Sequence, residues 1–109
     1  MQNKRVVVTG LGAVTPIGLN VNEFWDGLIS GKNGVAPITY FDASRFDTKF
    51  AAEVKNFNPD NYFDKKSVKR LDRFSQFAIA SSVQAIEDSN INLDKLDKNR
   101  AGVIYGSGI

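Results

Sequence analysis

The sequence contains neither cysteine nor histidine, and these two absences exclude much of enzyme chemistry. Such a chain has no thiolate nucleophile, no imidazole general base, no disulfide bond and no zinc site built from the usual ligands. Carboxylates, lysines, hydroxyl groups and backbone amides are the groups that remain. Mechanisms that depend on a thiol or an imidazole are therefore excluded for these 109 residues.

A large excess of one charge and long apolar runs are also missing. The 14 Lys and Arg residues nearly balance the 12 Asp and Glu residues, and a net charge of +2 is too small to indicate nucleic-acid binding. No apolar run approaches the length of a membrane span, and none near the start has the length of a signal-peptide core. We therefore expect at most one globular domain, located in the cytoplasm.

The first elements expected are a strand and a helix separated by a glycine-rich turn. Residues 6–8 are three valines followed by Gly10 and Gly12, which predicts a short strand buried on both faces, typical of a parallel α/β sheet. Asn20 or Asn22 is expected to cap the following helix. That helix carries apolar residues on one face and ends at glycines: Phe24, Trp25, Leu28 and Ile29, then Gly31 and Gly34.

The segment from 35 to 62 is irregular and is predicted to be a long loop held to the body by isolated aromatic side chains. Within it, residues 50–54 predict a short edge strand. The aromatic residues concerned are Tyr40, Phe41, Phe46, Phe50 and Phe57.

The strongest helix is predicted from about residue 72 to residue 89, with Asn90 at its end. It is apolar or small around most of its circumference, which predicts burial. One face consists of small residues on which another backbone can pack closely, and a second face is apolar. The small residues are Ala78, Ser81, Ser82 and Ala85, and the apolar ones are Ile79, Val83 and Ile86.

Residues 101–106 predict a second buried strand. Two such strands and a helix that is apolar all round need covering layers that the sequence does not supply. We therefore expect a piece of a larger α/β protein that is poorly soluble on its own. A monomeric 109-residue species that melts cooperatively would contradict this expectation.

Three glycine-containing segments resemble functional motifs but fail at defining positions. In residues 10–15, Thr15 stands where a dinucleotide fingerprint has glycine or alanine, and the acidic residue expected about twenty positions later is missing. Residues 27–32 miss the spacing of a P-loop. Ser107 lies between glycines, but no histidine exists to activate it. We favour structural turns and keep nucleotide binding as the weaker alternative.

Positive charge is concentrated at Lys65, Lys66, Lys69, Arg70 and Arg73. In one continuous helix, the last four of these side chains would share a face, where like charges repel. The charge pattern alone gives equal support to two interpretations. One is a solvated surface, and the other is a docking site for an acidic partner or for phosphate groups.

A series of motifs runs through the whole chain in a fixed order and spacing. They are residues 4–18, 41–42, 49–51, 54–58, 65–66, 70–74 and 106–109. Together they resemble the β-ketoacyl-acyl-carrier-protein synthases, the decarboxylating condensing enzymes of bacterial fatty-acid synthesis. Their order and spacing are similar to those of the type II synthases.

The resemblance implies an α/β protein with the thiolase-like fold, a five-layered αβαβα arrangement of two similar halves. Residues 1–109 would form the opening part of the first half, an incomplete ketosynthase domain. The helix at 72–89 would lie in the helical layer between the two sheets. Because the family's Cys and two His lie further along than Ile109, the resemblance implies no catalytic residue, no metal site, no cofactor and no activity in this segment alone.

The resemblance also implies two functional positions. Lys66, Lys69 and Arg70 match basic residues that dock the acidic acyl carrier protein, which favours function over a solvated surface. Ile109 matches the residue beside the acyl pocket. Since type I synthases tend to have glycine there, Ile109 favours type II and a long-chain acyl substrate.

For the intact protein, the resemblance implies a homodimeric acyltransferase that condenses an acyl thioester with malonyl-acyl-carrier-protein. Two alternatives stay open. One is a polyketide-type ketosynthase or its chain-length partner, and the other is a non-catalytic module that binds a carrier protein.

Overall fold

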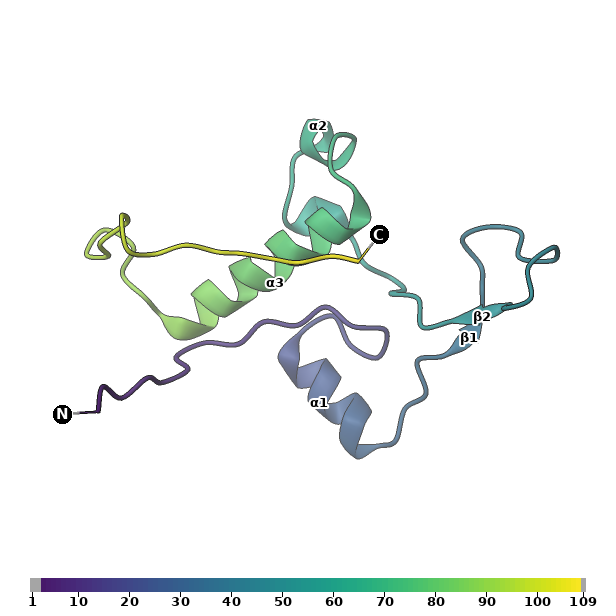
Figure 1. Cartoon of the computed structure of the whole chain (residues 1–109), viewed down its shortest axis with the longest axis horizontal. Coiled ribbons are helices and arrows are strands. Elements are labelled where there is room, and N and C mark those ends of the chain that lie inside the picture. The colour runs from purple at the N-terminus through teal and green to yellow at the C-terminus, as the bar shows by residue number, and fades with distance from the viewer. Residues whose placement is uncertain (1–2, 109) are drawn as a thin grey trace.

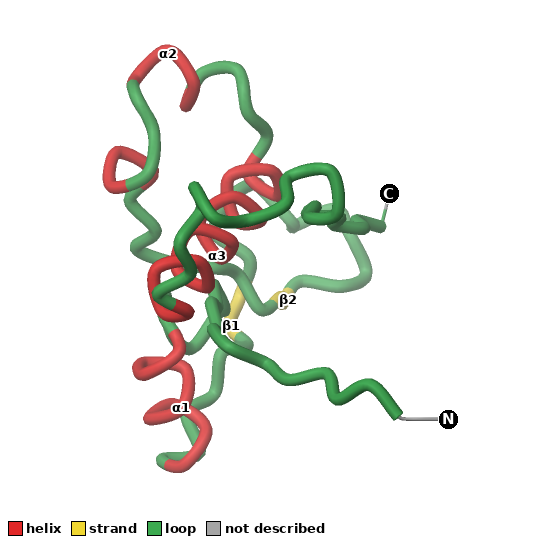
Figure 2. The backbone as a smooth tube through the Cα atoms, turned by 90° about the vertical axis from the view of Figure 1, so that its left-hand side faces the viewer, coloured by secondary structure: helices red, strands yellow, loops and turns green. Residues whose placement is uncertain are grey.

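A computed structural model describes residues 3–108 and arranges them around one long helix, α3 (Arg73–Ser89). Figure 1 shows the amino-terminal and carboxy-terminal segments passing beside this helix, and Figure 2 shows the amino-terminal end leading away from it. The other elements are α1 (Val21–Ile29), β1 (Ala36–Pro37), β2 (Phe50–Ala51), the 3-10 helix η1 (Pro59–Asn61) and α2 (Lys65–Val68).

Helix α1 begins and ends where the sequence predicts. The Asn20 side chain accepts a hydrogen bond from the Glu23 amide at 2.9 Å, so Asn20 rather than Asn22 is the cap. The Glu23 carboxylate in turn accepts from the Leu19 amide at 2.8 Å, close to the reciprocal pattern of a capping box. After the helix, Gly31 has a φ of 66°, a conformation that glycine adopts without steric cost.

Helix α3 also has the predicted bounds. It follows Asp72 and ends at Asn90, whose φ of 52° and ψ of 28° give the left-handed cap. The expected burial on all sides is wrong: within α3 only Gln76 and Ala80 are buried, and Ile79 remains 40% exposed. One side of the helix is covered by the two terminal segments, and residues 3–108 supply no layer for the rest.

The small-residue face of α3 packs closely against the glycine turn, as predicted. A Cβ atom on Gly10 would overlap the Ala85 carbonyl oxygen, and one on Gly12 would overlap the Ser81 carbonyl oxygen. The glycines of this turn are therefore needed for contact with a helix backbone, which supports the structural interpretation of residues 10–15.

Polar side chains of α3 bind the backbone of the same turn. Gln84 accepts a hydrogen bond from the Ala13 amide at 3.0 Å and donates to the Leu19 carbonyl at 2.8 Å and to the Tyr62 hydroxyl at 2.9 Å. Asp88 accepts from the Leu11 amide at 2.9 Å. The contacts with Leu11, Ala13 and Leu19 join segments more than sixty positions apart in the sequence.

Replacing Gln84 by glutamate tests this network. The substitution keeps the shape of the side chain but removes its N–H donors, leaving the Leu19 carbonyl unpaired and a carboxylate beside it. We expect a loss of about 1–3 kcal/mol in the free energy of unfolding, measured by urea denaturation of the intact protein. The exposed Glu87 on the same helix provides the control, because Glu87→Gln should change stability by less than about 0.5 kcal/mol. Equal effects of the two changes would contradict the network.

Strands β1 and β2 form a small antiparallel pair in which Ala36 faces Ala51 and Pro37 faces Phe50. This confirms the strand predicted at 50–54, although it covers only two residues. Beyond the pair, the Glu53 carboxylate accepts from the Thr39 amide and hydroxyl and from the Tyr40 amide. The hairpin is therefore held by side chains as well as by its ladder.

The two buried strands expected at residues 6–8 and 101–106 are not formed. Both segments are extended but belong to no strand, and Val6 and Ile104 are 93% and 97% exposed. A buried parallel strand requires neighbours at both edges and layers on both faces, and residues 3–108 contain none of these for either segment. The parallel sheet that the valines at 6–8 predicted is thus absent from the described part of the chain.

The overall shape is open. The radius of gyration over Cα atoms is 17.3 Å, whereas a self-contained domain of about this length has a radius of about 13 Å. Large apolar side chains remain on the surface of α1, α3 and the two extended segments. Among residues 3–108, no helix combines the length and the apolar composition that crossing a membrane requires.

Candidate functional site

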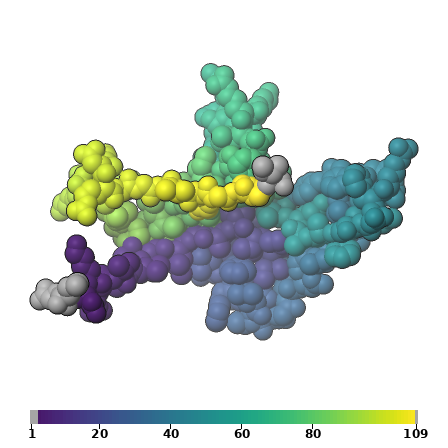
Figure 3. All heavy atoms as spheres, viewed as in Figure 1, coloured from purple at the N-terminus to yellow at the C-terminus, as the bar shows by residue number. Residues whose placement is uncertain are grey.

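The basic cluster lies on a short projection formed by α2 and the turn after it (Figures 1 and 3). Lys66 is in the helix, Lys69 and Arg70 follow in the turn, and all three side chains are exposed. Their positive charges are therefore accessible to a partner from the solvent. We refer to residues 64–70 as the basic projection.

Asp64 shapes this projection by capping α2. Its Oδ1 atom accepts hydrogen bonds from the Lys66 and Ser67 amides, both at 2.9 Å, and its Oδ2 atom accepts from the Ser67 hydroxyl at 2.9 Å. The hydrogen bonds from Ser67, followed by that from Lys66, lower the pKa of Asp64 below its ordinary value of 3.8. The cap places a carboxylate at the helix end where it offsets the lysines.

The titration of Asp64 gives a prediction for acid stability. Its pKa in the folded protein lies below that of the unfolded chain, so its stabilising effect is complete above a pH of about 3.8 and is lost as the pH falls further. An NMR titration of the intact protein should show the Lys66 and Ser67 amide signals moving with the Asp64 carboxyl. Asp64→Ala should abolish this transition, and Asp72→Asn should preserve it, because Asp72 makes no capping bond with its side chain.

Lys66, Lys69, Arg70 and Arg73 do not lie in one continuous helix, so the shared face that such a helix would give them is not formed. Helix α2 ends at Val68, and α3 begins only at Arg73. Repulsion between closely spaced cations disfavours one continuous helix here, and the extended backbone at Asp72, with a ψ of 156°, separates α2 from α3.

Arg73 turns away from the basic projection. Its guanidinium donates to the Tyr40 hydroxyl and to the Val54 carbonyl, both at 3.1 Å. It also stacks over the rings of Tyr40 and Phe77, 4.9 and 5.0 Å from their centroids. Arg73 therefore anchors the β1–β2 hairpin to α3. The spacing of Arg73 and Phe77 on one helix face indicates their mutual contact but not the contact with the hairpin.

Gln76 attaches the basic projection to the long helix. This buried side chain donates to the Val68 carbonyl at 3.2 Å and to the Leu71 carbonyl at 3.0 Å. The sequence analysis missed this residue, although a lone glutamine within an apolar stretch of helix is a signal for such a contact.

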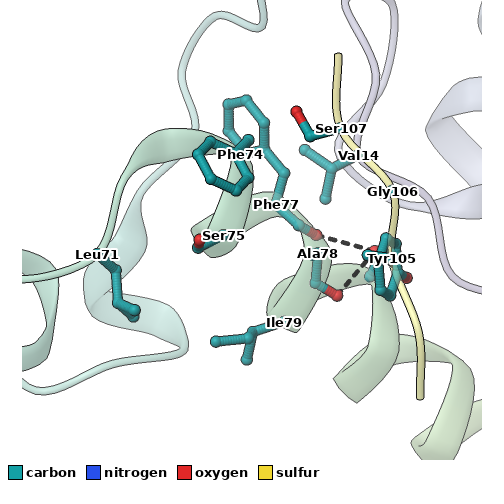
Figure 4. A pocket seen from close by; sticks show the side chains of 11 residues that line it. Val14, Leu71, Phe74, Ser75, Phe77, Ala78, Ile79, Tyr105, Gly106 and Ser107 are labelled. Carbon is teal, nitrogen blue, oxygen red and sulfur yellow. Dashed lines mark hydrogen bonds between the residues drawn. The ribbon is translucent and has the colours of Figure 1, made fainter. Parts of the chain in front are cut away.

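An open hollow of about 640 Å³ lies beside the projection. Its walls are mostly apolar, with hydroxyl groups at intervals (Figure 4). The lining residues are Val14, Leu71, Phe74, Ser75, Phe77, Ala78, Ile79, Ser81, Tyr105, Gly106 and Ser107. Leu71 directly follows Arg70, so the hollow and the basic projection are continuous in the chain.

Tyr105 fixes the carboxy-terminal segment to α3. Its hydroxyl lies 2.8 Å from the Ser81 hydroxyl and accepts a hydrogen bond from the Ser82 hydroxyl at 3.3 Å. These contacts, that with Ser81 above all, lower the pKa of Tyr105 below its ordinary value of 10.0. Gly106 and Ser107 are thereby held at the hollow, while the predicted acyl-pocket residue Ile109 lies outside the described residues.

The glycine turn packed on α3, between extended terminal segments whose apolar side chains stay exposed, is the arrangement of one part of a layered α/β protein. Residues 3–109 match the family model described as the β-ketoacyl synthase, N-terminal domain. The chain belongs to this family.

Among curated proteins, the chain is similar to the 3-oxoacyl-acyl-carrier-protein synthase 2 of two organisms. It is 48% identical to that of Synechocystis sp. and 50% identical to that of Coxiella burnetii, over 109 residues in both cases. Each match covers 100% of this chain and 26% of the relative. The chain thus spans about a quarter of the length of these relatives.

Solved structures confirm the fold class. The ishigamide ketosynthase/chain length factor is similar with a TM-score of 0.73 and 34% identity, covering 83% of this chain and 22% of its own. A β-ketoacyl synthase from Burkholderia phymatum is similar with a TM-score of 0.66 and 29% identity, covering 85% and 23%. The thiolase-like class predicted from the motifs is therefore correct, although residues 3–108 do not form its central sheets.

Proposed function

We propose that the intact protein is a condensing enzyme of fatty-acid synthesis and that residues 1–109 are the amino-terminal part of its ketosynthase domain. In this reaction an acyl group moves from its carrier protein to a cysteine of the enzyme. The thioester carbonyl is then attacked by the carbanion that malonyl-acyl-carrier-protein forms on losing carbon dioxide. The cysteine would lie outside these residues, which contain none.

The observation that carries this proposal is the similarity of the whole chain to proteins named 3-oxoacyl-acyl-carrier-protein synthase 2. Identities of 41–50% extend over 109 residues in proteins named for an acyl-carrier-protein-linked substrate. The motif series, the glycine turn against α3 and the basic projection fall within this similarity. We infer a carrier-protein-dependent acyltransferase.

Acyl carrier protein is the proposed partner of the basic projection. Lys66, Lys69 and Arg70 are exposed together on a segment that protrudes from the body, and an acidic protein complements their charge. Arg73 is not included, because its guanidinium binds Tyr40 and Val54. The proposed dock thus consists of three cations.

We further propose Ile109 as a residue beside the acyl pocket and a long acyl chain as the substrate. The support for this proposal is that Gly106 and Ser107, which shortly precede Ile109 in the sequence, line the apolar hollow. A homodimer in the cytoplasm is the proposed form of the intact enzyme, in keeping with the fatty-acid synthesis enzymes that it resembles.

A ketosynthase/chain length factor is the second candidate function, because the structure of that description has the higher TM-score of the two reported above. Such a protein would share this segment and differ elsewhere. The two candidates are separated by whether the intact protein condenses substrates without a second, different subunit.

Transfer of an acyl group to the intact protein tests the proposal. Incubation with acyl-acyl-carrier-protein alone should give a protein mass increased by one acyl group, held as a thioester that hydroxylamine removes. A protein that takes up no acyl group would be the non-catalytic binding module left open by the sequence. Mass spectrometry of the intact protein distinguishes the two results.

A further inference from the structure

The turn after α1 contains the only asparagine of the sequence that precedes a glycine, Asn33 before Gly34. Asn33 is exposed, and neither residue belongs to a helix or strand. Within residues 3–108, the Gly34 amide donates no hydrogen bond. Since glycine also has no Cβ, nothing on its own side chain hinders approach to this nitrogen.

The Asn33 carboxamide is held in a turn that favours attack on its carbon. Its Oδ1 atom accepts a hydrogen bond from the Val35 amide at 2.9 Å, which is the pattern of an Asx turn. A donor on this oxygen stabilises negative charge that develops there when the carbonyl carbon is attacked, as donors in an oxyanion hole do.

Positive charge lies nearby. Lys32 and Lys55 line the same hollow as Asn33 and Gly34, with a volume of about 430 Å³, and outnumber its one lining carboxylate, that of Glu23. Lys32 also donates to the Ile17 carbonyl at 3.3 Å, which holds its ammonium group at the turn. Cations close to a backbone amide favour its deprotonated, negatively charged form.

We propose that Asn33 is a site of spontaneous deamidation in the folded protein. Hydroxide removes the Gly34 amide proton, the nitrogen forms a bond to Cγ of Asn33, and the bond from Cγ to Nδ2 breaks. Ammonia leaves after taking a proton from water, and a succinimide remains. One water molecule then opens this ring at either carbonyl to give aspartate or isoaspartate, without oxidation or reduction.

The product is stabilised where it forms. Deamidation adds one carboxylate to the hollow that already contains the side chains of Lys32 and Lys55. Two lining cations against the single Glu23 carboxylate favour the ionised product. The reaction also lowers the net charge of these residues from +2 to +1, the change produced by one new carboxylate.

A second reactive pair in the chain provides an internal control. Asp26 precedes Gly27, the only Asp-Gly pair in the sequence, and can form the same succinimide. Both residues lie in α1, and Gly27 is buried, so its amide is engaged in the helix and shielded. Folding should therefore suppress the reaction at Asp26 and permit it at Asn33.

The test uses the intact protein, purified without refolding and incubated in mildly alkaline buffer with and without concentrated urea. Peptide mapping by mass spectrometry follows deamidation, and an isoaspartyl methyltransferase detects isoaspartate. Asn33 should deamidate in the folded protein within about tenfold of its rate in urea, which corresponds to about 1.4 kcal/mol in activation free energy. Isoaspartate at Asp26 should form only in urea.

Two variants complete the experiment. Asn33→Asp supplies the authentic aspartate product for the mapping, and Asn33→Gln should lose the reaction because its longer side chain cannot form the five-membered ring. An Asn33 that stays intact in the folded protein while the urea sample converts would overturn the proposal.

Discussion

Gly12→Ala should destabilise the intact protein by about 3 kcal/mol or more in urea denaturation. The added Cβ atom would overlap the Ser81 carbonyl oxygen on α3, which is backbone and cannot move aside without displacing the helix. Separating the turn from α3 would also weaken the hydrogen bonds that Gln84 and Asp88 make to it. The expected loss in the free energy of unfolding is therefore large for a substitution that adds only one methyl group.

Gly31→Asn is the matched control. Gly31 is exposed in the turn after α1, and a Cβ atom there would meet nothing within 4 Å among residues 3–108. Its φ of 66° is one that asparagine tolerates. We expect this variant to lie within about 1 kcal/mol of the unmodified protein. Similar stability of the Gly12 and Gly31 variants would show that the turn does not pack on α3 as described.

The second large effect is expected when Lys66, Lys69 and Arg70 are all changed to glutamate in the intact enzyme. If the basic projection docks the acidic carrier protein, like charges then face each other across the contact. A cost of about 3 kcal/mol would raise the KM for acyl-acyl-carrier-protein about 100-fold. Because the projection is exposed, kcat and the unfolding curve should change little.

Reversing the charge of three other exposed cations provides the control for the change in total charge. Lys95, Lys98 and Arg100 are exposed in the segment after α3, away from the projection in Figures 1 and 2. Changing these three to glutamate alters the net charge equally and should leave the KM nearly unchanged. The affinity of the unmodified enzyme should also fall as salt is added, because exposed charges are screened over about 8–10 Å. Equal KM values for the two triple variants would remove the projection as the dock.

Features that depend on a few neighbouring residues were predictable from the sequence. The Asn20 cap, the left-handed Asn90 and the bounds of α3 are decided within one or two helical turns, where side-chain oxygens and backbone conformation are local matters. The small residues of α3 also correctly predicted close packing, since helical periodicity places them on one face.

Features that depend on distant partners were not predictable in the same way. The valines at 6–8 have the composition of a buried strand, but a strand forms only beside another strand, and residues 3–108 offer none. Arg73 appeared to be part of the basic cluster because the sequence does not show that Tyr40 and Val54 lie within its reach. The basic cluster was visible as charge, whereas the break that separates Arg73 from its other members lies at the extended backbone of Asp72.

Condensation by the intact protein is the most direct test of the account. The purified protein is mixed with acyl-acyl-carrier-protein and malonyl-acyl-carrier-protein, and both carbon dioxide and the extended β-ketoacyl product are measured. We predict that the two products appear in equal amounts without a second, different subunit. An intact, folded protein that binds carrier protein but releases neither product would contradict the assignment as a condensing enzyme.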